Sequence, residues 1–186
     1  MAKRSWKPGT MVYPLPAVLV TCGTAEKPNV FTVAWTGIVN TVPPKTYISL
    51  RKSRYSYELI ERTGEFVINL TTRELAFATD YCGVKSGRDV DKFRELGLTP
   101  VPAEQVKAPL IGESPVNIEC RVRQVMPLGS HDMFIADVVA VHADEKYMDD
   151  NHKFHLEKAE PIVYSHGAYL ACGEQLGTFG YSVKKK

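Results

Sequence analysis

A basic turn, predicted to lie between a strand and a helix, carries the clearest chemical signal. Residues 49–57 read SLRKSRYSY, with three cations, three serines and two tyrosines. A helix N-terminus attracts anions because its first N–H groups are free and the helix dipole is positive there. Arg51 and Arg54 can add charge-assisted hydrogen bonds, and Ser53 and Ser56 can donate hydroxyls. The turn therefore suits a phosphate monoester, unless its cations only solvate a surface turn, as they commonly do.

A second basic loop leads into another predicted helix. Residues 82–89 read CGVKSGRD, and the two glycines permit close approach of the backbone to a ligand. The loop lacks the Gly-x-x-x-x-Gly-Lys-Ser/Thr spacing of a P-loop. Like the first turn, it either binds an anion or is a solvated helix start.

An uncharged segment precedes both basic stretches. Residues 29–40 read NVFTVAWTGIVN and combine small residues, hydroxyls and Trp35. A flat heteroaromatic ring binds in such a setting, which is an apolar slot with a few placed hydrogen bonds. The alternative is an ordinary core strand in which Trp35 fills space.

Motifs for metal binding or acid–base catalysis are not found. His152 and His155 have no carboxylate or thiol spaced to complete a metal site, and His166 is a lone histidine of the kind more typical of a surface or core position. The four cysteines are Cys22, Cys82, Cys120 and Cys172. They form no Cys-x-x-Cys pair and are interpreted as reduced thiols of a cytoplasmic protein. We predict no metal and no catalytic side chain.

The elements that position these segments are mostly strands. Residues 18–24, 30–42 and 47–50 are β-rich and apolar and predict an antiparallel meander. Residues 66–70 and 116–122 are further strands. In residues 116–122 apolar and polar side chains alternate, which predicts a strand with one buried and one solvent-exposed face. Residues 133–143 pair with the latter strand, and residues 161–164 form the last strand. Residues 98–115, rich in proline, are expected to be an irregular loop.

Three short helices are predicted between these strands. The first runs from about residue 54 and ends at Gly64. A capping-box pattern from Thr71 to Glu74 opens the second, which Gly83 ends. The third spans residues 89–96, with Asp89 as its N-cap. The resulting fold class is mainly β, an antiparallel barrel of six or more strands with short helices at its ends.

Composition predicts one domain over residues 1–186, since 186 residues is an ordinary domain length. A net charge of +2 argues against a nucleic-acid partner, which would require a basic face. The N-terminus lacks the apolar run of a signal peptide, and no stretch is long and apolar enough to span a membrane. We therefore expect a cytoplasmic protein with no membrane association. The lysines at 184–186 are expected to form a solvated tail.

Taken in order, these segments resemble the flavin reductase-like family, and its flavoredoxin branch most closely. The resemblance rests on TVAWTG at 32–37, the proline pair at 43–44, SLRK at 49–52 and YSY at 55–57. It continues through GEFVINL at 64–70 and CGVKSGRDVDKF at 82–93 and extends from about residue 12 to residue 180. The C-terminal region with Tyr164, His166 and Tyr169 matches only loosely.

The resemblance implies an FMN-binding split barrel that holds FMN non-covalently, usually as a homodimer with flavin sites near the subunit interface. The residues implied along the isoalloxazine ring are Thr32, Val33, Ala34, Trp35, Thr36 and, nearby, Asn40. Those implied at or leading to the phosphate are Ser49, Leu50, Arg51, Lys52, Ser53, Ser56 and Tyr57. Lys85 and Lys92 would face the flavin or an incoming nicotinamide nucleotide.

The implied activity is that of an oxidoreductase which accepts hydride from NAD(P)H on bound FMN and passes electrons to free flavin or another acceptor. Because flavin N5 does the chemistry, no acid–base pair is needed. The alternative is a flavoredoxin-type electron-transfer protein with a protein partner and little direct NAD(P)H activity. A third possibility, without flavin, is a β-barrel that binds an anionic partner through its basic turns.

Overall fold

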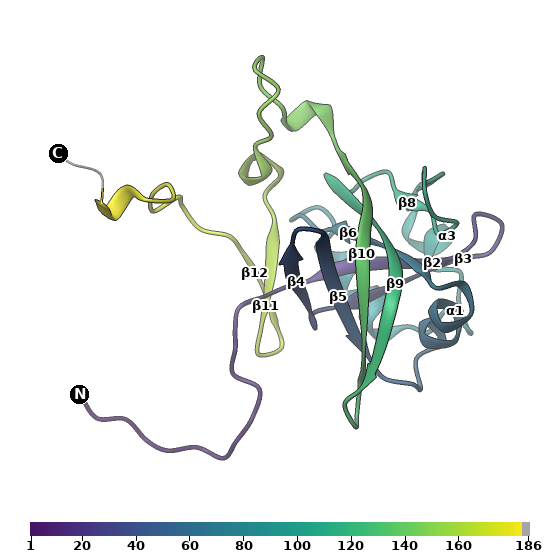
Figure 1. Cartoon of the computed structure of the whole chain (residues 1–186), viewed down its shortest axis with the longest axis horizontal. Coiled ribbons are helices and arrows are strands. Elements are labelled where there is room, and N and C mark those ends of the chain that lie inside the picture. Colours follow the sequence, from purple (N-terminus) through teal and green to yellow (C-terminus); the bar gives the residue numbers. More distant parts are fainter. Residues whose placement is uncertain (184–186) are drawn as a thin grey trace.

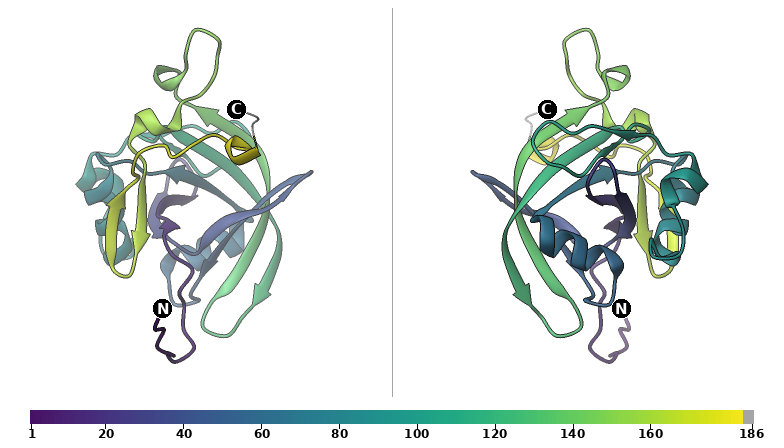
Figure 2. Two further views of the ribbon diagram at one scale, coloured as in Figure 1. Left: turned by 90° about the vertical axis from the view of Figure 1, so that its left-hand side faces the viewer. Right: turned by 90° about the vertical axis from the view of Figure 1, so that its right-hand side faces the viewer.

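The computed structural model describes residues 1–183, and the lysine tail predicted at 184–186 lies outside them. The centre is a seven-stranded antiparallel sheet in the order β3-β2-β6-β9-β10-β5-β4. These strands are β2 (Val18–Gly23), β3 (Pro28–Val33), β4 (Thr36–Thr41), β5 (Pro44–Leu50), β6 (Glu65–Leu70), β9 (Val116–Pro127) and β10 (Asp132–Ala143). The sheet curls into an open barrel (Figures 1 and 2), which confirms the predicted fold class.

Two smaller sheets flank the barrel. β1 (Leu15–Pro16), β11 (Ile162–Ser165) and β12 (Ala168–Ala171) form one, and β7 (Pro100–Val101) pairs with β8 (Leu110–Ile111) in the other. Two predictions were therefore wrong. The segment 98–115 contains two short strands, and β12 follows the strand predicted to be last, after a turn at His166 and Gly167 with positive φ angles of 48° and 85°.

Within the described residues, three α-helices lie among the strands: α1 (Tyr55–Thr63), α2 (Ala76–Val84) and α3 (Lys92–Leu96). Short 3-10 helices span Glu145–Tyr147, Leu156–Ala159 and Tyr181–Val183. α1 ends, as predicted, at Gly64, whose φ of 68° is left-handed. Within residues 1–183, none of the helices has the length and apolar character to cross a membrane.

α3 also ends at Leu96, before Gly97, as predicted. The starts of α2 and α3 and the end of α2 differ from the prediction, and at both starts the residue predicted to cap the helix does not do so. The Thr71 hydroxyl donates to the carbonyl of Ala17 instead of capping a helix, and α2 begins only at Ala76 and continues through Gly83 to Val84. Asp91, rather than Asp89, caps α3 by accepting the N–H of Arg94 at 3.2 Å.

The segment predicted as one strand at 30–42 is two strands on opposite edges of the sheet. β3 pairs with β2 and β4 pairs with β5, so the predicted three-strand meander is wrong. Residues Ala34 and Trp35 cross between the edges, and the Trp35 carbonyl accepts the N–H of Ser49 at 2.9 Å. Neither glycine nor proline marks this break, because it follows from the way the curved sheet brings its edges together.

The face of β9 that the alternation of apolar and polar residues predicted to be exposed to solvent is partly covered. Asn117 and Glu119 are buried because residues 103–111 cover that face of the sheet. On the opposite face, Cys120 joins the interior of the barrel with Phe66, Phe134 and Ile60. The interior thus includes the inner face of α1, which fixes where the turn before that helix lies.

Candidate functional site

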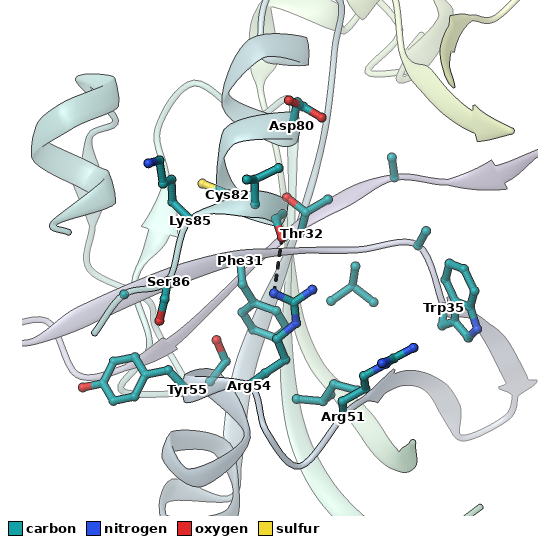
Figure 3. Close-up of a pocket in the computed structure, with 18 of the residues that line it drawn as sticks. Phe31, Thr32, Trp35, Arg51, Arg54, Tyr55, Asp80, Cys82, Lys85 and Ser86 are labelled. Carbon is teal, nitrogen blue, oxygen red and sulfur yellow. Dashed lines mark hydrogen bonds between the residues drawn. The ribbon is translucent and has the colours of Figure 1, made fainter. Parts of the chain in front are cut away.

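A cavity of about 920 Å³ lies where β3, the turn before α1 and the end of α2 meet (Figure 3). Small-molecule sites commonly have volumes of about 300–1,000 Å³. The predicted site residues that line it are Thr32, Val33, Ala34, Trp35, Ser49, Leu50, Arg51, Ser53, Ser56, Lys85 and Lys92. The fold therefore brings the three segments singled out in the sequence to one cavity.

Four predicted site residues do not line this cavity. The hydroxyl of Thr36 donates to the Tyr47 carbonyl at 2.7 Å, between the paired strands β4 and β5. The amide of Asn40 donates to the Pro43 carbonyl at 2.8 Å in an exposed turn. The other two, Lys52 and Tyr57, share a partner behind the basic turn.

That partner is Asp132, the first residue of β10, which is 2% exposed. Tyr57 donates its hydroxyl to Oδ2 of Asp132 at 2.7 Å, and Nζ of Lys52 lies 3.4 Å from the same oxygen. The hydrogen bond to this carboxylate raises the pKa of Tyr57 to about 12. Oδ1 of Asp132 is buried and has no hydrogen-bond partner among residues 1–183. Lys52 and Tyr57 therefore connect the basic turn before α1 to β10, through Asp132, and do not line the cavity.

The two basic loops meet at the start of α1, where hydrogen bonds connect them. Arg54 donates to the Gly83 carbonyl at 3.4 Å, and Arg88 donates to the Ser53 carbonyl, also at 3.4 Å. Arg88 lies 3.5 Å from Glu58, which offsets part of its charge. The side chains of Arg51 and Lys85, in contrast, make no hydrogen bond or ion pair within residues 1–183. Figure 3 shows Arg51 and Lys85 on different sides of the cavity, so unpaired positive charge is spread along the two basic loops, beside the N-terminus of α1, which suits a phosphate.

Lys92 is buried, with 4% of its surface exposed, and shapes the second loop. Its Nζ donates to the carbonyls of Lys85 and Cys82 at 3.1 and 3.4 Å, near the C-terminal end of α2. Burial lowers the pKa of the Lys92 ammonium. Cations at a helix C-terminus satisfy its free carbonyls and its dipole, so Lys92 holds the loop in place as well as lining the cavity.

Gly87, which lines the cavity, packs closely against Asn29. A Cβ atom at this position would lie 2.0 Å from Oδ1 of Asn29, a side chain that also donates to the Ser56 hydroxyl at 2.8 Å. Any larger residue would displace this hydrogen-bonded pair next to the start of α1. The glycine noted in the sequence for close backbone approach is thus required by packing.

The uncharged wall of the cavity comes from β3 and the crossing at Ala34 and Trp35. The hydroxyl of Thr32 donates to the Thr79 carbonyl, which ties β3 to α2. The Trp35 ring stacks on His131, with 6.2 Å between ring centroids and 3° between planes. Burial and the charges of Arg51 and Arg54 lower the pKa of His131, which favours its neutral form at the cavity.

Sequence reasoning missed several cavity residues. His131 lies in the turn between β9 and β10, and Asp80 is on α2, so neither belongs to a recognisable motif. Tyr164 and Tyr169, which the sequence matched to the family only loosely and assigned no role, and Gly167 come from the β11–β12 hairpin, which only tertiary packing brings to the cavity. Across residues 1–183, no cluster of three or more His, Cys, Asp or Glu side chains is arranged to hold a metal ion.

The fold and the cavity together define a class: a β-barrel protein whose cavity has cationic side chains from two loops and an uncharged wall along β3. Residues 10–173 match the family described as the flavin reductase like domain. The chain belongs to this family, as its motifs predicted.

Its similar structures include two flavoredoxins. The flavoredoxin of Desulfovibrio vulgaris (Miyazaki F) is 35% identical with a TM-score of 0.91, covering 98% of this chain and 100% of that one. The flavoredoxin from Methanosarcina acetivorans is 27% identical with a TM-score of 0.89, covering 99% and 98%. An uncharacterised protein of Archaeoglobus fulgidus is 35% identical over 147 residues, 77% of this chain and 82% of that protein. The predicted likeness to the flavoredoxin branch is thereby confirmed.

Proposed function

We propose that this chain is an FMN-binding oxidoreductase. The observation that carries the proposal is one cavity with unpaired cations from two loops beside a helix N-terminus, and an uncharged wall along its side. A phosphate monoester fits the first feature and a flat heteroaromatic ring fits the second. Its family membership and its likeness to two flavoredoxins support flavin as the ring.

In this proposal the phosphate is bound at the turn before α1. Arg51 supplies a free guanidinium, Ser53 and Ser56 supply hydroxyls, and Lys85 adds a second free cation from the other loop. Arg54 and Arg88 fasten the two loops together. Lys52 and Tyr57 contribute indirectly, through Asp132.

The ring lies along Thr32 to Trp35, with backbone groups of this segment serving its polar edge. When bound, FMN supplies hydride and electron transfer, so the chain needs no acid–base pair of its own. Trp35 and His131 border the ring site, and the neutral form of His131 avoids adding charge there. The role of the chain in this proposal is to bind the ring and orient it along this wall.

We propose NAD(P)H as the hydride donor and free flavin or another acceptor as the destination of the electrons. A second candidate is a flavoredoxin-type electron-transfer protein with little direct NAD(P)H activity. The similarity to the Desulfovibrio flavoredoxin along nearly the entire chain favours this second candidate. The two share the flavin site and differ in the source and the destination of the electrons.

The test begins with the absorbance spectrum of the purified protein, reconstituted with FMN if it is colourless. Protein that neither carries nor takes up flavin would refute the proposal and favour an anion-binding barrel. Anaerobic stopped-flow mixing with NADH and with NADPH then follows flavin bleaching. Rapid bleaching by either nucleotide supports the reductase. Slow bleaching by both, with fast reduction by a ferredoxin-type donor, supports the electron-transfer protein.

We further propose that two copies associate. β4 is an edge strand, and Ile38 and Val42 on and beside it are 86% and 87% exposed. Exposed apolar edge strands readily pair with another chain. The terminal segments, which extend from the barrel on the β11–β12 side (Figure 1), also carry exposed aromatics, including Trp6 and Phe179. Association would cover these surfaces.

A further inference from the structure

The cavity has a second end that the proposed phosphate and ring sites do not use. It is lined by Asp80 from α2 and by Tyr164, Gly167 and Tyr169 from the β11–β12 hairpin. Figure 3 shows Asp80 at the opposite end of the cavity from Tyr55 and Ser86, which border the cationic turn. The two ends therefore differ in charge, and the volume of about 920 Å³ is near the upper end of the range of about 300–1,000 Å³ for small-molecule sites.

The tyrosines of this end form a fixed aromatic wall. Tyr164 and Tyr169 are directly opposite in the β11–β12 register, so their side chains share one face of the hairpin. Their ring centroids are 5.7 Å apart with an interplanar angle of 59°. Tyr13 adds a second layer, 6.2 Å from Tyr164 and 4.2 Å from His166 between centroids.

The base of the hairpin is fastened to the segment that leads into α2. The Arg73 N–H donates to the Glu160 carbonyl at 2.9 Å, and the side chains of these residues pair at 3.1 Å. The Ile162 N–H donates to the Thr71 carbonyl at 3.3 Å. Since α2 also carries Asp80, these bonds connect the hairpin that carries the tyrosines to the segment just before the helix that carries the carboxylate.

The charge at this end is negative. Asp80 alone, of the described residues lining the cavity, carries a carboxylate, and it makes no salt bridge within residues 1–183. Burial and the nearby Asp80 carboxylate raise the pKa of the Tyr169 hydroxyl to about 12, so Tyr169 stays neutral. Neutral tyrosine faces attract cations through their quadrupole, most strongly where solvent is partly excluded. A carboxylate beside two tyrosine rings therefore selects for a positively charged, flat group.

We propose that the hairpin end is a subsite for a planar aromatic cation of the pyridinium type. This inference rests on the proposed function, because the redox partner of a flavin must approach the ring wall that adjoins the subsite. Two sources share this chemistry: the oxidised nicotinamide ring of a pyridine nucleotide, and a separate pyridinium-type electron acceptor. Asp80 sets the preference for charge and the tyrosine pair sets the preference for a flat ring.

The test is calorimetric titration of the full-length, FMN-loaded protein with 1-methylnicotinamide. Neutral nicotinamide is the matched ligand, since it has the same ring and amide without the charge. The cation is expected to bind about threefold to fivefold more tightly, the range of a partly exposed charge pair. Asp80→Asn is expected to remove this difference, and Tyr169→Leu to weaken both ligands.

Glu74→Gln is the control variant, because it removes an exposed carboxylate just before α2 that does not line the cavity. It should leave the preference for the cation unchanged. Equal binding of the two ligands by the unaltered protein, or an unchanged preference in Asp80→Asn, would overturn the subsite. An unaltered FMN spectrum and melting temperature check that each variant is folded.

Two further titrations distinguish the sources. Weaker binding of NAD⁺ by Asp80→Asn assigns the subsite to the nucleotide, whereas weaker binding of methyl viologen alone assigns it to a separate acceptor. Failure of the proposed function is seen separately, as failure to bind FMN. The same titrations run on that colourless protein still report on the hairpin end.

Discussion

At the scale of single residues, the cationic end of the cavity depends on which side chains are free. Arg51 and Lys85 make no side-chain hydrogen bond or ion pair within residues 1–183, whereas Lys52, next to Arg51, lies 3.4 Å from Asp132. A cation that is already paired with a carboxylate in the protein contributes less electrostatic attraction to a bound anion. Adjacent cations in one turn are thus expected to contribute unequally to phosphate binding.

Arg51→Ala is expected to weaken FMN binding by about 1.5–3 kcal/mol, the range for a hydrogen bond to a charged group. Lys52→Ala is the matched variant, with an expected loss below about 1 kcal/mol because its exposed ion pair is worth little. Titration of the flavin-free protein with FMN, followed by fluorescence quenching, gives both dissociation constants. Equal losses in the two variants would show that the phosphate lies elsewhere on the turn.

Tyr57→Phe is expected to lower the free energy of unfolding by about 1–3 kcal/mol. The reason is that Oδ2 of buried Asp132 would lose its hydroxyl donor while Oδ1 already lacks one. Urea denaturation measures the change. Tyr55→Phe, which removes a hydroxyl with no hydrogen bond in residues 1–183, serves as control and should change stability little. A loss in the control as large as in Tyr57→Phe would argue against the role of Asp132.

At the scale of elements, β9 is organised around a buried carboxylate. Glu119 is fully buried and accepts N–H groups from Glu104, Gln105 and Val106 at 2.9, 2.6 and 3.0 Å. His142 lies 2.6 Å from it on β10. These contacts attach residues 104–106 to the sheet and explain why Glu119 in β9 is buried and not exposed to solvent.

This arrangement predicts a pH dependence of stability. Burial acts to raise the pKa of Glu119, but the N–H groups of Glu104 and Gln105 and the His142 ring outweigh it and lower the pKa below 4.5. A lowered folded-state pKa means that the stabilisation is present above about pH 4.5 and is lost as pH falls through the folded value.

Glu119→Gln should therefore be less stable than the unaltered protein at pH 7, by about 1–3 kcal/mol, because an amide cannot accept all three N–H groups as a carboxylate does. The difference should shrink on acidification from pH 5 to pH 3. Thermal melts across this range provide the measurement, and a difference independent of pH would contradict the assignment.

At the scale of the whole molecule, the exposed apolar residues at the β4 edge of the barrel lead us to expect a dimer. Ile38→Lys should shift the protein from dimer toward monomer, because a charge would replace an 86% exposed apolar side chain on the unpaired edge of β4. Sedimentation velocity at micromolar concentration measures the shift. Phe77→Lys, at a position 74% exposed on α2, is the control for added charge and should leave assembly unchanged. A monomeric unaltered protein would exclude the proposed dimer.

The sequence by itself determined the features that depend on neighbouring residues. The basic turn before α1, the end of that helix at Gly64, the strand pair β9–β10 and the family motifs are all local patterns. Their physics is short-range: helix caps, turn residues, alternation of apolar side chains and charge within a few positions.

The tertiary structure alone decided which side chains reach the cavity and which are held behind it. Tyr57 is adjacent to Ser56 in sequence but is directed to Asp132, 75 positions away, while Tyr164 and Tyr169 reach the cavity on a hairpin from near the end of the described chain. The break at Trp35 likewise exists because the curved sheet brings β3 and β4 together from its two edges. The physical reason is that the covering of a face and the pairing of a charge depend on segments far apart in sequence, whose positions no local pattern encodes.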